Sequence, residues 1–205
     1  MNLPASVGHW SPWHRNACPP ALSAHWPPQV CGFQSGIVKR LPPLSARAPG
    51  IVGAALADRR LTAGLIVDGV HVDPISVRAA FTAKGSDRIA LITDAMPTVG
   101  TSLEHFELTG RTIRLSDGRL TTKEGTLAGA HLDMASAVRN AVRMAELPLD
   151  DALRAASLTP ARFLGLDNER GALFPGARAD LVALSQELTV AATWVYGSKE
   201  DVTDV

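Results

Sequence analysis

The sequence predicts an α/β fold in which parallel strands alternate with helices. Two short apolar runs rich in β-branched residues, within Gly64–Asp68 and Arg88–Thr93, are typical of strands that are buried on both faces. Between them, Pro74–Lys84 has a helical pattern, with proline suited to the first turn and a Gly-Ser stop after it. Such a strand–helix–strand unit predicts two parallel strands joined by a right-handed crossover.

The chain before these strands has an unusual composition. Residues 1–57 contain no Asp or Glu, and they hold both cysteines, three of the four tryptophans and nine of the fourteen prolines. Met1–Arg40 shows no helical or strand period, and its proline pairs interrupt regular structure, so we expect residues 1–40 to be irregular. Pro42–Ala57 is expected to be a loop that leads into a short helix, IVGAALA.

Beyond Asp94 the pattern becomes one of alternating residues separated by turns. The segments FELTG, RTIRLSDGRL and TTKEGTL predict a small β-meander, with an Asp-Gly hairpin turn at Asp117-Gly118. A long helix is expected at about His131–Glu146, where apolar residues recur at helical spacing. These residues are Ala135, Val138, Val142 and Ala145, with Met134 and Ala141 beside them.

The remainder predicts two short helices and two strands. Asp150 is expected to cap the helix DDALRAA, and Thr159 to cap a helix that begins at Pro160 and stops at Gly165. GALFPGARADLVALS and VAATWVYG are expected to form strands around turns.

Composition excludes several classes of partner. The chain has 205 residues and zero formal net charge, from 20 basic and 20 acidic residues, so we expect neither a nucleic-acid nor a membrane partner. No apolar run approaches the roughly 20 residues of a membrane span, and a secretory signal is not expected. Cys18 and Cys31 have the spacing of neither a zinc site nor a redox pair, which favours a reducing cytoplasm.

Two polar residues follow the predicted strands. Asp94 ends the second strand, where a carboxylate is well placed for general acid–base chemistry; the alternative is that it caps the following turn. His71 follows the first strand between Asp68 and Asp73, which would orient its ring toward an anionic or hydroxyl-rich ligand. The alternative is a histidine that is simply bonded to one of these acids.

Three motifs in fixed order, DGVHVDP (68–74), LITDAMP (91–97) and EGTLAGAHLDM (124–134), resemble N-acetylglucosamine-6-phosphate deacetylases. These form a sugar-phosphate branch of the metal-dependent amidohydrolases, and the resemblance covers the second half of such an enzyme. It implies that residues 41–165 form the C-terminal part of a (β/α)₈ TIM-type barrel with the meander inserted. Residues 166–205 would add the terminal strands of a small β-sandwich. The implied reaction releases acetate from N-acetylglucosamine 6-phosphate, a small-molecule partner, and the intact enzyme would be a homodimer.

The resemblance also implies roles for individual residues. Asp94 would be the catalytic acid/base, and Arg47, in ARAPG, would bind the 6-phosphate through its planar guanidinium. The other substrate-binding residues would be Asp68, Gly69, Val70, His71, Leu127, Ala128 and Gly129. The alternatives are a solvated loop arginine for Arg47, and a plain turn and helix start for the Leu-Ala-Gly segment. The family has a small residue where His131 stands in this chain.

The family's divalent metal, zinc or iron, lacks most of its ligands in this sequence. The family's T-H-L-x-N-A-M segment falls on Ser35–Leu41, with Gly36 in place of the metal-binding histidine and Lys39 in place of an asparagine. His9, in SVGHW, is the one candidate ligand, and the glutamate ligand has no counterpart. We therefore expect the chain alone to bind no metal and to have negligible activity.

We interpret Trp10–Arg40 as out-of-frame or misjoined sequence, and expect an aggregation-prone or partly folded fragment because two buried strands would lack neighbours. Two other functions stay open. One is an amidohydrolase acting on a cyclic amide or ureido substrate. The other is a non-catalytic remnant that binds a sugar phosphate or a protein partner.

Overall fold

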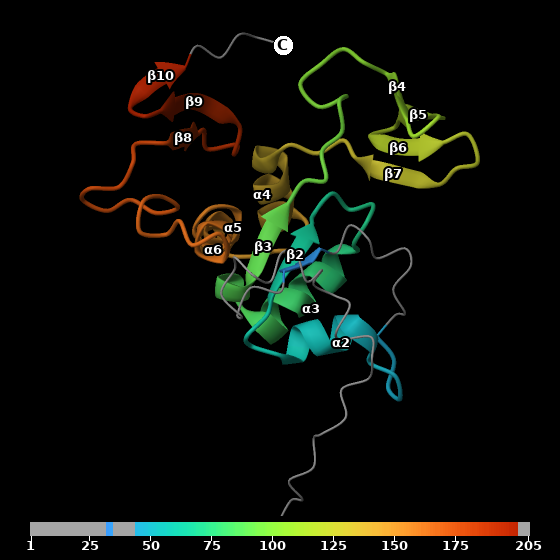
Figure 1. Ribbon diagram of the computed structural model, residues 1–205, viewed down its shortest axis with the longest axis horizontal. Coiled ribbons are helices and arrows are strands. Elements are labelled where there is room, and N and C mark those ends of the chain that lie inside the picture. The colour runs from blue at the N-terminus through green and yellow to red at the C-terminus, as the bar shows by residue number, and fades with distance from the viewer. Residues whose placement is uncertain (1–31, 35–43, 201–205) are drawn as a thin grey trace, which may run out of the picture. The chain divides into compact units, whose positions relative to one another are not determined.

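The computed structural model describes residues 32–34 and 44–200, with side chains from Leu44 to Glu200 (Figure 1). The described strands form three sheets, and helices precede and connect them along the chain. In chain order they are β1 (Gly32–Gln34), α2 (Gly50–Ala57), β2 (Thr62–Ile66), α3 (Pro74–Lys84), the 3₁₀ turn η3 (Ser86–Arg88), β3 (Ile89–Ile92), β4 (His105–Leu108), β5 (Arg111–Ser116), β6 (Arg119–Thr122), β7 (Leu127–Ala130), α4 (Met134–Arg143), α5 (Leu149–Ala156), α6 (Leu158–Phe163), β8 (Leu181–Leu184), β9 (Val190–Val195) and β10 (Ser198–Glu200).

The first sheet confirms the predicted strand–helix–strand unit. Strands β2 and β3 pair in parallel, from Ala63 opposite Ile89 to Ile66 opposite Ile92, and Figure 1 shows both running in the same direction. Helix α3 has the predicted bounds because the Asp73 carboxylate accepts from the Ile75 N–H at its start, and Gly85, with φ +80°, ends it.

Three details of this sheet differ from the sequence prediction. Strand β3 spans Ile89–Ile92, one residue shorter at each end than predicted. Strand β2 begins at Thr62 and ends at Ile66, two residues earlier at each end than predicted, since the chain turns after Val67. Strand β1 pairs in parallel with β2 from Gly32 to Gln34, which lies inside the segment expected to be irregular. The sheet therefore has three described strands, in the order β1-β2-β3.

The core surrounds β2 and β3. The consecutive residues Leu65, Ile66 and Val67 are all buried, which requires cover on both faces of the sheet. Side chains from α3 and from α4 and α5 supply this cover, including Phe81 and Val138. Burial of each large aliphatic side chain contributes about 1.5–3 kcal/mol, so this cluster is the main source of stability among the described residues.

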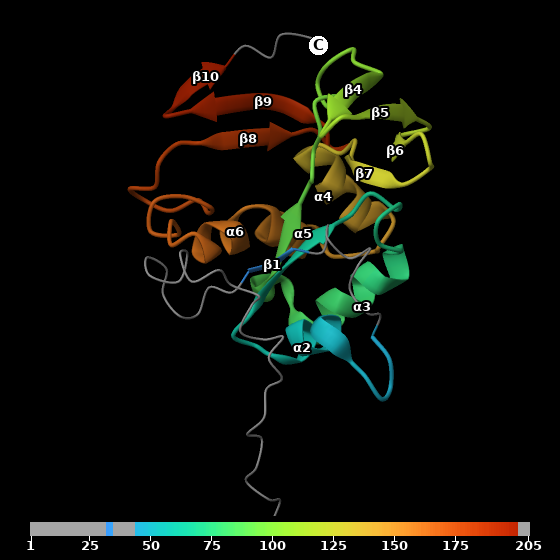
Figure 2. The same ribbon diagram turned by 45° about the vertical axis from the view of Figure 1, so that its right-hand side comes forward.

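The second sheet confirms the predicted β-meander. Strands β4, β5, β6 and β7 pair antiparallel in that order and form a sheet of their own (Figure 2). Asp117 and Gly118 both have positive φ, +50° and +73°, which matches the hairpin turn that an Asp-Gly pair favours. Ile113 and Leu120 are buried on one face of this sheet.

Helix α4 is shorter than predicted at both ends. The Asp133 carboxylate caps its start by accepting from the Ser136 N–H, and the helix ends at Arg143. Its fully covered side chains are Ala137, Val138 and Ala141, so the buried stripe includes Ala137, which the predicted stripe left out.

The two predicted caps after α4 are wrong. Helix α5 begins at Leu149 behind Pro148, and Asp150 lies in its first turn, where a negative charge is still favourable. Helix α6 begins at Leu158, and the buried Thr159 hydroxyl donates to the Ser86 carbonyl oxygen instead (2.7 Å).

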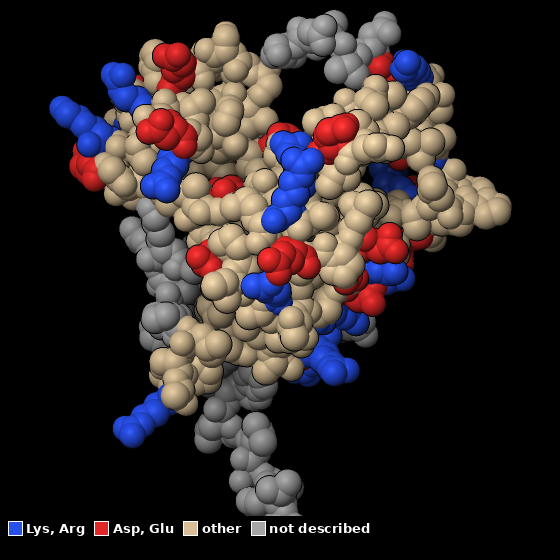
Figure 3. All heavy atoms as spheres, turned by 180° about the vertical axis from the view of Figure 1, so that it is seen from behind, with Lys and Arg blue, Asp and Glu red and all other residues tan. Residues whose placement is uncertain are grey.

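The third sheet contains the predicted terminal strands in the order β10-β9-β8, with β10 as an addition that the sequence did not suggest. Within the described part of the chain, no helix has the length and apolar character needed to cross a bilayer. Basic and acidic side chains are interspersed on the face shown in Figure 3, without a patch of one sign.

Candidate functional site

The loop after β2 is built around the Asp68 carboxylate. One oxygen, Oδ1, accepts from the backbone N–H groups of Val70 (2.9 Å) and His71 (2.8 Å). The other, Oδ2, lies 2.7 Å from His71 Nδ1, and the two side chains are only 12% and 11% exposed. Burial raises the pKa of the Asp68 carboxyl, but the hydrogen bonds from His71 and Val70 outweigh it, so the pKa lies below its usual value.

The second carboxylate expected beside His71 has another task. Asp73 caps α3 through the Ile75 N–H and makes no hydrogen bond or ion pair with the His71 ring, so the prediction that both acids orient His71 is wrong for Asp73. Helix α3 begins at Pro74, and the N–H groups of its first turn have no partner within the helix, so the Asp73 carboxylate is used to cap it.

Helix α4 holds the same loop from its other side. The Asn140 side-chain amide donates to the carbonyl oxygen of Val67 (2.9 Å), the residue directly before Asp68. Gly69 has φ +72°, and a Cβ there would lie 2.5 Å from the terminal methyl of Met144. Gly69 is therefore required by the turn and by the close approach of Met144, and it supplies no side chain for a ligand.

Asp94 lies just beyond β3 in the left-handed region, with φ +52°. Its carbonyl oxygen accepts from the Ala130 N–H (2.9 Å), and the Met96 N–H donates to the Ala130 carbonyl (3.1 Å), so Ala95 and Ala130 form a parallel bridge. The Asp94 carboxylate accepts no hydrogen bond from any residue in the described ranges, so the alternative in which it caps the turn is wrong. Asp94 is half-buried.

The Leu-Ala-Gly segment forms a strand, β7, and the bridge at Ala130 carries it to the loop of Asp94. Gly129 has φ +80°, and a Cβ on it would lie 2.4 Å from side-chain carbons of Met96. The following helix does not begin here, as the sequence suggested, because Asp133 caps it at Met134. Two of the three sequence motifs are thus joined by backbone hydrogen bonds, with a glycine at the contact.

His131 and Thr98 form a contact that sequence reasoning missed. Thr98 is fully buried, and its hydroxyl lies 3.0 Å from His131 Nδ1, which fixes the ring of an otherwise exposed histidine. His131 directly follows the bridged Ala130, so this imidazole belongs to the rim that carries Asp94. The departure at His131 from the family's small residue was the only signal in the sequence.

Arg47 is not brought to these residues. It lies exposed in the turn that ends at Ala48, and no hydrogen bond or ion pair joins it to another described side chain. His9 and the Ser35–Leu41 segment lie outside the described residues.

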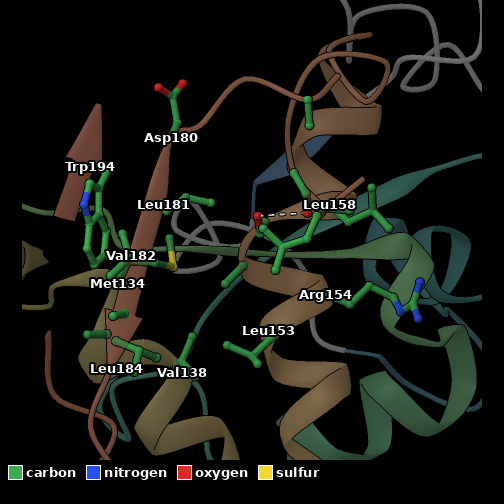
Figure 4. A pocket seen from close by; sticks show the side chains of 18 of the residues that line it. Met134, Val138, Leu153, Arg154, Leu158, Asp180, Leu181, Val182, Leu184 and Trp194 are labelled. Carbon is green, nitrogen blue, oxygen red and sulfur yellow. Dashed lines mark hydrogen bonds between the residues drawn. The ribbon is translucent and has the colours of Figure 1, made fainter. Parts of the chain in front are cut away.

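A cavity of about 1290 Å³ lies away from these motifs. In Figure 4, Val138 of α4 and Leu153 of α5 lie opposite Val182 and Leu184 of β8. Its walls are mainly apolar and contain none of the predicted site residues, so size alone does not identify the chemical site.

Comparison with known proteins gives the family. Residues 51–204 match the model of the amidohydrolase family. The chain belongs to this family.

Its relatives include an N-acetylgalactosamine-6-phosphate deacetylase of Escherichia coli, 41% identical over 154 residues, which cover 75% of this chain and 41% of that protein. The N-acetylglucosamine-6-phosphate deacetylase of Haemophilus influenzae is 37% identical over 168 residues, covering 80% of this chain and 44% of that one. The crystal structure of the N-acetylglucosamine-6-phosphate deacetylase of Pasteurella multocida matches 78% of this chain and 42% of its own, with TM-score 0.75 and 36% identity. The chain thus spans less than half the length of each of these relatives, and these structural neighbours confirm the predicted α/β class and part of a TIM-type barrel.

Amidohydrolases are generally metal-dependent. No group of three or more His, Cys, Asp or Glu side chains within residues 44–200 is placed to hold a metal ion. Asp94 has no second ligand beside it, and both oxygens of Asp68 already accept hydrogen bonds within its own loop. The described residues therefore do not fit a metal centre.

Proposed function

We propose that this chain carries part of the active site of an amino-sugar 6-phosphate deacetylase, which hydrolyses the acetamide of N-acetylglucosamine 6-phosphate. The observation that carries the proposal is the Ala95–Ala130 bridge. It joins the loop of Asp94, whose carboxylate makes no hydrogen bond to a described residue, to the end of β7 that contains Gly129. Deacetylases of this substrate class among the relatives support it.

The chemistry is a hydrolysis in which Asp94 moves one proton. Water adds to the amide carbonyl carbon, the bond between that carbon and the sugar nitrogen breaks, and the products are acetate and glucosamine 6-phosphate. Asp94 accepts the proton that the water loses and returns it to the departing nitrogen. His71 would contact the sugar phosphate, Arg47 would bind the phosphate as a bidentate partner, and Val70 with the Leu127–Gly129 segment would line the pocket.

A zinc or iron ion would belong to the family's reaction, but the described residues do not fit one, and no step here is routed through it. This favours a second candidate for the isolated chain, a non-catalytic protein that binds a sugar phosphate. The name of the Escherichia coli relative adds the galactosamine epimer as a second ligand to test. For the intact enzyme we propose a homodimer with the exposed Arg47 close to the subunit boundary, which light scattering would check by molar mass.

The test uses the full chain and both 6-phosphate epimers, with acetate release and calorimetric binding as separate readouts. Turnover that Asp94→Asn abolishes supports the deacetylase. Binding without turnover in the presence of zinc or iron supports the second candidate, and absence of both rejects the two proposals. Asp117→Asn is the matched control, because Asp117 has the same backbone conformation as Asp94, with φ +50°, but lies in an exposed hairpin turn.

A further inference from the structure

The Asp68 carboxylate is fully used inside its own loop. Oδ1 accepts two backbone N–H groups, and Oδ2 is paired with His71 Nδ1. A carboxylate has two oxygens and accepts through both, so one that binds three donors at 2.7–2.9 Å while 12% exposed offers little to a further ligand. This differs from the role that family resemblance gives Asp68, which is direct substrate binding.

The same contact determines which nitrogen of His71 is protonated. An ionised carboxylate only accepts, so Nδ1 must carry the hydrogen in the Asp68–His71 pair. The other nitrogen, Nε2, bonds no residue among those described, and it is not among the fully buried atoms that lack a partner. An imidazole that is 11% exposed, with one nitrogen held and the other open, presents a single atom to a ligand.

We propose that Asp68 is a positioning residue which holds His71 as the Nδ1–H tautomer and directs Nε2, as a hydrogen-bond acceptor, at a hydroxyl of the bound sugar phosphate. This rests on the proposed function for the identity of the ligand. Asp68 does not touch the ligand; it acts through the ring of His71. The Asn140 bond to Val67 supports this role, since it fixes the chain at the residue before Asp68.

The tautomer is measured first, by ¹⁵N NMR of the imidazole nitrogens in the full chain without ligand. We expect the Nδ1–H form in the wild type. In Asp68→Asn we expect a shift to the Nε2–H form, because a carboxamide can donate to Nδ1. Asp73→Asn is the matched control: it changes a carboxylate two residues from His71 that caps α3, and it leaves the tautomer unchanged. An Nε2–H form in the wild type overturns the proposal.

Ligand binding then separates positioning from direct contact. We expect Asp68→Asn to weaken N-acetylglucosamine 6-phosphate binding about tenfold, as loss of a hydrogen bond does, with thermal melting as the check on folding. In a His71→Ala background the same substitution should have no further effect. An equal loss in that background means that Asp68 touches the ligand, and the proposal fails. If the wild type does not bind the sugar phosphate, the proposed function fails, and the tautomer measurement alone decides the role of Asp68.

Discussion

Two aspartates follow two neighbouring parallel strands, yet their side chains differ in their hydrogen bonds. Asp68, after β2, binds two backbone N–H groups and an imidazole. Asp94, after β3, has a left-handed backbone and a carboxylate with no hydrogen bond or ion pair to a described residue, while its carbonyl oxygen accepts from the Ala130 N–H. The same residue type at the ends of two neighbouring strands thus supports a loop in one place and makes no side-chain hydrogen bond to a described residue in the other. Position at a strand end identifies both, but only the contacts distinguish their roles.

The largest expected effect comes from the glycine beside Asp94. Gly129→Val places a Cβ about 2.4 Å from Met96 side-chain carbons, in a conformation with φ +80° that β-branched residues avoid. We expect the free energy of unfolding to fall by about 3 kcal/mol or more, as measured by urea denaturation. Gly110→Val is the control, since Gly110 has φ +74° but open space around its Cβ. Equal losses at both sites would show that the contact with Met96 contributes nothing.

Asp68→Asn should destabilise more than Asp94→Asn. The change removes a charged acceptor from the ring of His71 and weakens the bonds to two N–H groups, and we expect a cost of about 1.5 kcal/mol in the free energy of unfolding at pH 7. Denaturant titration of both variants gives the difference. If Asp94→Asn costs as much, the contrast between the two strand ends is wrong.

The lowered pKa of Asp68 predicts how its contribution depends on pH. A carboxyl whose folded pKa lies below its unfolded value stabilises the fold above the unfolded pKa, near 3.9, and loses this contribution as pH falls through the folded pKa. The difference in unfolding free energy between the wild type and Asp68→Asn should therefore be constant from pH 7 to about 5 and shrink below about pH 4. A difference that grows on acidification would contradict the assignment.

Asn140→Ala tests how α4 supports the Asp68 loop. The variant removes the donor to the Val67 carbonyl, and we expect a loss of about 1 kcal/mol in the free energy of unfolding. Hydrogen exchange should also become faster at the N–H groups of Val70 and His71. Unchanged exchange at these two amides would show that the loop does not depend on α4.

The smallest effect is expected at Asp94 itself. Asparagine tolerates the left-handed region, and no described hydrogen bond is lost, so Asp94→Asn should change stability by less than about 0.5 kcal/mol. Thermal melting and denaturant titration measure it. A large loss would reveal a structural task for this carboxylate.

Local signals in the sequence were sufficient for several elements. Helix α3 begins after its cap Asp73, with Pro74 as its first residue, and ends before Gly85. These local signals predicted its bounds to the residue. The Asp117-Gly118 pair and the alternation around it predicted the meander. Family motifs led to Asp68, His71 and Asp94 as candidates, because motif residues can be read along the chain.

Only the tertiary structure determined the contacts between residues that are distant in the sequence. Thr159 bonds Ser86 and Asn140 bonds Val67, each across 73 positions, and Thr98 meets His131 across 33. The bridge from Ala95 to Ala130 likewise places Asp94 beside Gly129. A cap or a turn depends on neighbours within a few residues, which the sequence displays directly. Whether a polar side chain hydrogen-bonds within the protein or remains free for a ligand depends on which distant donors packing places beside it. The residues next to it in the sequence do not show this.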